Sequence, residues 1–254
     1  MLALTSAPAA ALGPGEERWT HPAALAPLLD AQLLGITPAG HVLARTRTAS
    51  GALQIREWVP PAGPLRLLPS AARQTLLLLP AQPRARVFIR SQPALGGRPV
   101  QTLMARIGIG QRGCEGLAES VEAELGPLPP VHAARLRGPF QAGAYLIFEL
   151  ELGGRHSIEA LDAAELDAGM MNRAALAAYG LGCAAVARAL WEEALTIDAG
   201  FGDAAYNLAC VSALSGDLPG AEAWLDLALA IDPQRYRRLM KFDPDLEALR
   251  RPSR

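Results

Sequence analysis

The sequence has little of what builds disulfide frameworks, metal centres and membrane spans. Its 254 residues include three cysteines and four histidines. No cysteine pair forms C-x-x-C and no histidines have metal-ligand spacing, so we expect neither a disulfide framework nor a metal site. An odd cysteine count fits a reducing compartment, which predicts a cytoplasmic protein. No apolar run is long enough to cross a bilayer, so we expect no membrane partner.

The chain also lacks an excess of charge of either sign. The formal net charge is −1, which excludes a general electrostatic attraction to nucleic acid or to an anionic membrane. Lys241 is the only lysine, and every other basic residue is arginine. Together with the many alanines, glycines and prolines, this usage is typical of a GC-rich genome and indicates no function. Hydrophobic residues make up 50% of the chain, which is enough for a sizeable core.

Recognisable catalytic motifs are missing as well. The sequence contains no G-x-S-x-G, no H-E-x-x-H and no G-K-[ST]. Glu149 and Glu151 share one face of a predicted strand, but no partner for them is evident, so we interpret both as exposed. We therefore predict no catalytic residue, no cofactor and no enzymatic activity.

The C-terminal third contains an internal repeat with a period of 34 residues. The second repeat predicts a pair of helices joined by a turn at Gly216. Pro219 lies in the first turn of the second helix of this pair, and Pro233 follows the end of that helix. Small residues at Ala209, Ala221 and Ala228 predict close, buried helix contacts. The residue pairs that match at this spacing are Gly182 and Gly216, Ala187 and Ala221, Ala194 and Ala228, Leu195 and Leu229, Ile197 and Ile231, and Asp198 and Asp232.

The repeat resembles the tetratricopeptide family. The pattern of large, small, turn and proline residues in that family is matched by Leu208, Ala209, Gly216, Ala221, Leu225, Ala228 and Pro233. The first unit matches less well, because Ala199 replaces the terminal proline and Ala174 the large residue. "YNLACVSALSGD" followed by "FDPDLEALR" also resembles the last repeat and closing helix of many bacterial members. The resemblance covers residues 161–254.

The resemblance implies a concave groove lined by the first helix of each repeat. Some family members clamp the C-terminal carboxylates of a peptide with Lys and Asn side chains in this groove. Asn207 matches such an Asn, but Asn172 and Leu176 replace a Lys and another Asn, so that clamp is incomplete. Helix packing is an equal alternative for Asn207, and Cys183 and Cys210 are interpreted as inert packing residues. The predicted groove residues are Asn172, Arg173, Leu176, Tyr179, Tyr206, Asn207, Arg237 and Lys241.

The first 160 residues predict a different kind of structure. Two alternating segments, 41–47 and 53–60, are separated by a short turn and predict a β-hairpin. We predict helices over residues 18–35 and 114–126, and further strands over 74–80, 84–91, 99–108, 132–138 and 144–152. The predicted fold class is α+β, with a mostly antiparallel β-sheet domain and flanking helices followed by an all-α tetratricopeptide-like stack. The predicted domains are a disordered tail over 1–20, an α+β domain over 21–160, and two repeats with a capping helix over 161–254.

Gly108, Gly110 and Gly113 form a G-x-G-x-x-G pattern. Such glycines cradle a pyrophosphate only between a buried parallel strand and a helix. Arg135 and Arg137 lie where an acidic residue for the ribose is expected, and no second βαβ half fits before the repeats. We therefore interpret the glycines as a turn, with a dinucleotide-binding enzyme as the weakest alternative.

An arginine-rich strand is a second candidate for function. No acidic residue lies between Glu57 and Glu115. A positive strand face with a central aromatic can bind phosphates and stack a base. The alternative is a solvated face paired with Glu119, Glu122 and Glu124. The residues predicted to share this face are Arg84, Arg86, Phe88 and Arg90.

Together these patterns favour a non-enzymatic scaffold or adaptor. The predicted partner is a protein or peptide bound in the groove of the repeats. A nucleic-acid-associated factor that uses the arginine strand is the alternative.

Overall fold

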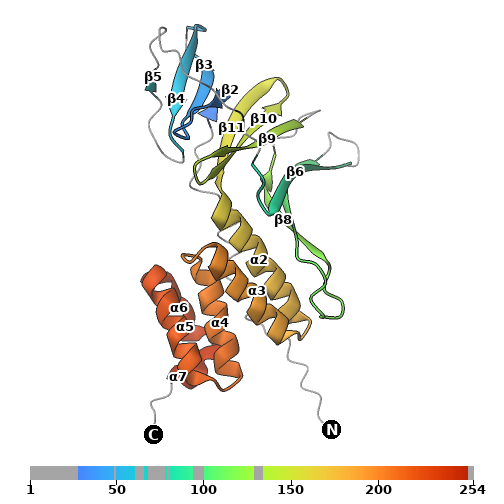
Figure 1. Cartoon of the computed structure of the whole chain (residues 1–254), viewed down its shortest axis with the longest axis vertical. Helices are drawn as coiled ribbons and strands as arrows, with labels where there is room; N and C mark the ends of the chain where they lie inside the picture. Colours follow the sequence, from blue (N-terminus) through green and yellow to red (C-terminus); the bar gives the residue numbers. More distant parts are fainter. Residues whose placement is uncertain are drawn as a thin grey trace. The chain divides into compact units, whose positions relative to one another are not determined.

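The computed structural model describes residues 28–48, 50–60, 66–67, 78, 81–93, 100–128 and 134–250 (Figure 1). These residues form two compact units. The β unit contains residues 28–105 and 124–166, and the helical unit contains residues 106–123 and 167–250. The tail predicted over 1–20, nearly all of the strand predicted over 74–80, and the first part of the helix predicted over 18–35 lie outside the described residues.

The predicted fold class is wrong. The described residues form three small antiparallel sheets followed by a C-terminal helical region, rather than one N-terminal β-sheet domain with flanking helices and a tetratricopeptide stack. The strands of the first sheet, in spatial order, are β2 (Ala31–Ile36), β3 (Val42–Arg47), β4 (Leu53–Trp58) and β5 (Arg66–Leu67). Those of the second are β1 (Leu28–Leu29), β11 (Arg155–Asp162), β10 (Tyr145–Leu152) and β9 (Ala134–Ala142). Those of the third are β6 (Ala85–Gln92), β7 (Val100–Gly108) and β8 (Ser120–Pro127).

The first two sheets share one hydrophobic core. On β2, Ala31 and Leu33 are buried while Gln32 between them is exposed, as expected for a strand with one face inward. The pairing register of β2 with β3 shifts by one residue between Leu33 and Gly35. The residues that form this core are Ala31, Leu33, Ile36, Val42, Ala44, Trp58, Ala142, Ile147, Ile158 and Ala160.

Two predicted helices contain strands among their described residues, which contributes to the wrong fold class. Within 114–126, Ala123 and Leu125 are buried and Glu124 between them is exposed, so the period is two rather than 3.6. The helix predicted over 18–35 is replaced at its end by β1 and β2, which are separated by Asp30 at a positive φ of 54°. Strand β11 has no counterpart in the prediction. The hairpin of β3 and β4 and the strands β6, β7, β9 and β10 are confirmed.

The helical region begins directly after β11. Its elements are α2 (Ala163–Gly180), α3 (Ala184–Ile197), α4 (Gly202–Leu214), α5 (Leu218–Ile231), α6 (Pro233–Phe242), the 3₁₀ turn η1 (Pro244–Leu246) and α7 (Glu247–Arg250). Asp162 caps α2 by accepting hydrogen bonds from the backbone amides of Ala164 and Glu165 at 2.9 and 3.0 Å. No helix among the described residues has both the length and the apolar character needed to cross a membrane.

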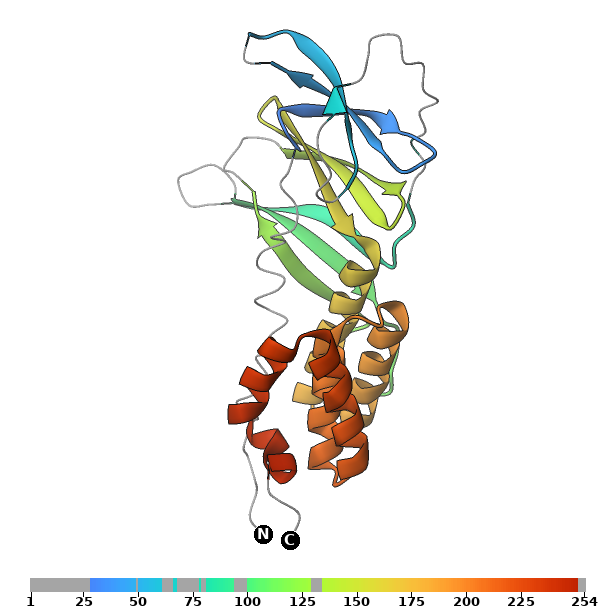
Figure 2. The ribbon, with the colours of Figure 1, turned by 90° about the vertical axis from the view of Figure 1, so that its left-hand side faces the viewer.

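The predicted 34-residue period is present in the helices. Helices α3 and α5 have 14 residues each, and both their ends are offset by the period. Gly182 and Gly216 precede them in left-handed backbone conformations, at φ of 80° and 83°. Helices α4 and α5 lie side by side (Figure 2). The burial predicted for Ala209, Ala221 and Ala228 is confirmed, since all three are 0% exposed.

Candidate functional site

The two predicted groove asparagines bond to each other inside the helical unit. The Asn172 side chain on α2 is 3% exposed. Its Oδ1 accepts hydrogen bonds from Trp191 Nε1 on α3 at 2.8 Å and from Asn207 Nδ2 on α4 at 2.9 Å. Because a buried amide must be paired, this contact fixes three helices to one another. The arrangement matches the packing alternative for Asn207 rather than a ligand clamp.

The predicted groove tyrosines occupy different environments. Tyr206 on α4 is 3% exposed, and its ring stacks on that of Tyr236 with centroids 5.5 Å apart. Its hydroxyl donates to Asp243 Oδ2 at 2.8 Å. Tyr179 on α2 is half-buried, with its ring centroid 5.9 Å from that of Trp191. Tyr179 therefore keeps part of its surface available.

Two aspartates that the sequence analysis did not single out complete this region. Asp243 and Asp245 lie between α6 and α7, and their carboxylates and the Cys210 thiol offer ligand atoms within 4.8 Å of one another. Cys210 Sγ is 3.7 Å from Asp243 Oδ2. Only the motif "FDPD" after the closing helix could have pointed to this segment. We call Tyr179, Tyr206, Cys210, Asp243 and Asp245 the tyrosine–aspartate cluster.

The cluster keeps its thiol and its two tyrosine hydroxyls protonated. Burial raises the pKa of the Cys210 thiol, and the carboxylates of Asp243 and Asp245 raise it further. Burial also raises the pKa of Tyr206 and of Tyr179, with smaller contributions from the same charges. A thiol that stays protonated at neutral pH is a poor nucleophile. Cys210, which is buried and outside the disulfide described below, therefore serves packing, as the sequence predicts.

The cluster resembles a cation site, but both carboxylate oxygens of Asp243 already accept hydrogen bonds. Asp243 Oδ2 accepts from Tyr206, and Asp243 Oδ1 accepts from the backbone amide of Asp245 at 3.0 Å. Burial and the neighbouring Asp243 charge raise the pKa of Asp245, which opposes a second negative charge here. As it stands, the arrangement fastens α4 to the segment after α6, and we assign it no metal.

The remaining groove candidates lie nearer the solvent. Leu176 on α2 is half-buried, and Arg173 on the same helix is exposed but has an interaction partner in the chain. Arg237 and Lys241 on α6 are exposed. Lys241 Nζ lies 5.2 Å from the centroid of the Phe242 ring, which is itself 77% exposed.

The arginine strand is only partly available to a partner. Arg84 and Arg86 are exposed, whereas Phe88 and Arg90 on β6 are half-buried. Arg84, Phe88 and Arg90 each have an interaction partner within the protein. The glutamates predicted to lie on a neighbouring helix lie instead on β8 and just before it, where Arg106 Nε donates to Glu122 Oε1 at 2.6 Å.

The glycine pattern lies in a connection between two strands. Gly108 ends β7, and Gly110 and Gly113 have positive φ angles of 66° and 70° in the segment that leads to β8. The amides of Ile109 and Gly110 both donate to the carbonyl of Glu119, which closes the connection at its base. A strand follows where a dinucleotide site would need a helix N-terminus. The geometry is that of a turn.

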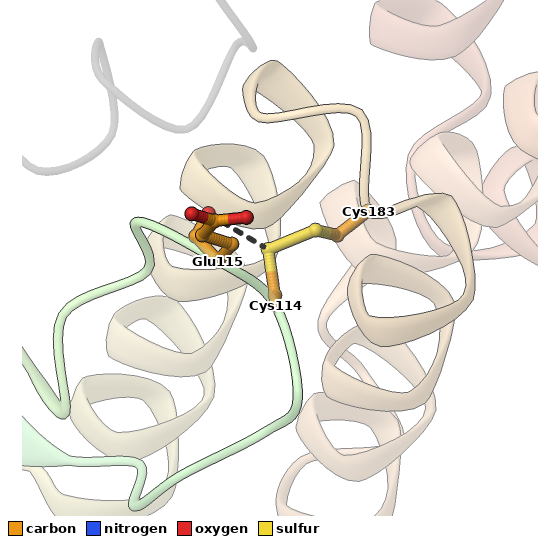
Figure 3. Close-up of a disulfide and its surroundings, with 3 residues drawn as sticks. All are labelled: Cys114, Glu115 and Cys183. Atoms are coloured by element: carbon orange, nitrogen blue, oxygen red, sulfur yellow. Dashed lines mark hydrogen bonds between the residues drawn. A yellow bond between two sulfur atoms is a disulfide. The ribbon is translucent and has the colours of Figure 1, made fainter.

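A disulfide contradicts the prediction that the cysteines are unpaired. Cys114, in the connection between β7 and β8, is bonded to Cys183 at the start of α3, with Cα atoms 5.9 Å apart (Figure 3). The partners are 69 residues apart in sequence, so no local motif marks them. The interpretation of Cys183 as inert filler is therefore wrong.

Glu149 also departs from its predicted exposed position. It is 5% exposed on β10, and its carboxylate accepts from the Leu33 amide at 3.2 Å and from Arg137 Nη1 at 3.1 Å. His156 Nδ1 on β11 lies 3.3 Å from the same carboxylate. Glu151 differs, because it faces the exposed Arg135 at 3.8 Å. The buried carboxylate joins β2 of the first sheet to the second sheet.

Comparison with known protein families, with curated proteins and with solved structures finds no match for this chain.

Proposed function

We propose that this chain is a non-enzymatic scaffold or adaptor that binds a protein or peptide through its helical unit. The binding surface is formed by α2, α4 and the segment between α6 and α7. The observation that carries the proposal is the convergence of Tyr179, Tyr206, Cys210, Asp243 and Asp245 from these three elements. The resemblance of the 34-residue repeat to the tetratricopeptide pattern supports it, because the first helix of each repeat contributes to the same place.

The chemistry of the cluster fits recognition better than catalysis. The Cys210 thiol is protonated, and the Tyr206 hydroxyl is already donated to Asp243. These groups hold the surface rigid, which lowers the entropic cost of binding. Leu176 and Tyr179 then supply an apolar side chain and an aromatic ring of the kind that dominate protein interfaces.

The predicted cytoplasmic location is part of this proposal. In a reducing compartment, the bond between Cys114 and Cys183 would form as part of a redox response rather than as a permanent link.

The test compares proteins retained from a lysate of the source cell by three forms of the full chain. Leu176→Ser/Tyr179→Ser removes the half-buried apolar groups from the proposed surface, while Glu222→Ser/Asp226→Ser changes exposed residues on α5. We expect wild type and the α5 variant to retain a common partner that the Leu176/Tyr179 variant loses. If all three forms retain the same proteins, the surface is assigned wrongly.

A further inference from the structure

The disulfide joins two segments of the helical unit that lie far apart in sequence. Residues 109–119, between β7 and β8, lie in the helical unit together with α3. Besides the Cys114–Cys183 bond, an ion pair of Arg112 Nη2 with Glu193 Oε2 at 2.9 Å links this connection to α3. Both charged side chains are about a third exposed, at 31% and 28%. A partly exposed pair of this kind is screened by solvent and holds the connection less firmly than the covalent bond.

The helices do not depend on the disulfide for their packing. Asn172 joins α2, α3 and α4 through Trp191 and Asn207. Arg188 on α3 donates to Ser212 on α4 at 2.6 Å. The hydrophobic core of the last helices draws its buried residues from positions 205–246, with none from the connection. Loss of the bond should therefore free the connection and leave the helices folded.

The disulfide is placed where a reductant can reach it and where reduction is favourable. Cys183 is half-exposed in the turn between α2 and α3, next to Leu181, which is 49% exposed. It occupies the N-cap position of α3 and makes no side-chain capping hydrogen bond. A thiolate at a helix N-terminus is stabilised by the helix dipole, which favours the reduced state.

From these observations we propose that the Cys114–Cys183 bond is a redox clasp, which fastens residues 109–119 to the start of α3 when oxidised and releases them when reduced. The electron donor is a dithiol, either a small molecule or a dithiol protein. Its thiolate attacks Cys183 Sγ and displaces Cys114, which takes up a proton. The second thiol of the donor then attacks the mixed disulfide and releases Cys183 as a thiol. Two electrons and two protons reach the protein, and the donor becomes a disulfide.

The test is hydrogen exchange of the full-length protein, oxidised and after dithiothreitol treatment, with thiols counted by alkylation. We expect reduction to expose two further thiols and to speed amide exchange in residues 109–119 by about tenfold or more, with α4 and α5 unchanged. Cys114→Ser/Cys183→Ser should show the fast exchange without reductant. Cys210→Ser serves as the matched control and should respond to dithiothreitol like the wild type.

Three results would overturn the proposal. If reduction, or the double serine substitution, removes protection from α3, α4 and α5 together, the bond is a structural staple of the helices. If residues 109–119 are as well protected from exchange after reduction as before it, the bond does not hold this connection in place. If the oxidised protein already has three reactive thiols after denaturation, the bond is not formed in solution. None of these results depends on whether the helical surface binds a partner.

Discussion

Each of the two units buries a carboxylate, but the hydrogen-bond partners of the two carboxylates lie at very different distances along the chain. In the helical unit, Asp203 is 1% exposed and accepts a 2.6 Å hydrogen bond from Tyr236, which lies 33 residues away. In the β unit, Glu149 accepts from the Leu33 amide, 116 residues away. The Asp203 contact thus spans about one 34-residue period, whereas the Glu149 contact joins segments from opposite ends of the β unit.

The largest expected effect breaks the long-range contact. Glu149→Ala leaves the buried Leu33 amide and the Arg137 guanidinium without their acceptor, and should lower the free energy of unfolding by about 3–4 kcal/mol. Glu149→Gln keeps an acceptor oxygen and should lose less. Denaturant titration measures the loss, and hydrogen exchange should place it in β2 and β10. An equal loss of protection in α4 and α5 would contradict the assignment of this contact to the β unit.

The corresponding change in the helical unit is Asp203→Ala. It removes the acceptor of the Tyr236 hydroxyl and the ion-pair partner of Arg235, whose Nη2 lies 3.1 Å from Asp203 Oδ1, so we expect a loss of about 2–3 kcal/mol in the free energy of unfolding. The exposed Asp226 on α5 offers a control, since Asp226→Ala should change stability little. The two variants are compared by denaturant titration. If Asp203→Ala leaves the free energy of unfolding unchanged, this contact does not hold the N-terminal half of α6 against α4.

The sequence predicts the helices of the repeat better than it predicts the strands of the β unit. The helices of the repeat are defined by residues close in sequence, such as the glycine at position 216 and the alanines at 221 and 228, so their ends and buried faces are predicted well. Strand β8 pairs with β7, and strand β11 pairs with β10 and with the distant β1, so neither strand is defined by its own residues alone. The glutamates of β8 obscure its alternation of buried and exposed residues, and the segment is therefore predicted to be a helix with glutamates on its exposed face.

The candidate site shows the same limit at the level of single residues. Tyr179 and Tyr206 are predicted because they lie on the first helices of the repeats. Asp243 and Asp245 are missed because only the turn after α6 brings them beside Cys210. The bond between Cys114 and Cys183 is missed for the same reason, since 69 residues separate the two cysteines.

A smaller effect tests whether the repeat packs as tightly as its alanines indicate. Ala221 is 0% exposed between α4 and α5, so Ala221→Leu should overpack that contact and lower the free energy of unfolding by about 1–3 kcal/mol. The adjacent Glu222 is exposed, and Glu222→Leu supplies the control with the same new side chain. Thermal unfolding that is identical for both variants would argue against close helix packing here.

The smallest effect concerns the pH dependence of the β unit. Burial raises the pKa of Glu159 on β11, while the Ser157 hydroxyl partly opposes the shift. The folded state therefore holds a proton at pH values where the unfolded chain has released it, and stability falls as pH rises through that window. Glu159→Gln should flatten this fall. Unfolding free energies measured between about pH 4 and pH 7 compare the two slopes, and equal slopes would show that Glu159 is not desolvated.

The central claim, that α2 and α4 present a binding surface, is tested most directly by photo-crosslinking in the source cell. A photoreactive amino acid replaces Leu176 on α2 in one form of the full-length chain and the exposed Glu222 on α5 in another. If α2 and α4 present this surface, we expect a discrete crosslinked species of one mass from position 176 that is absent from position 222. The same species from both positions, or none from position 176, would contradict it.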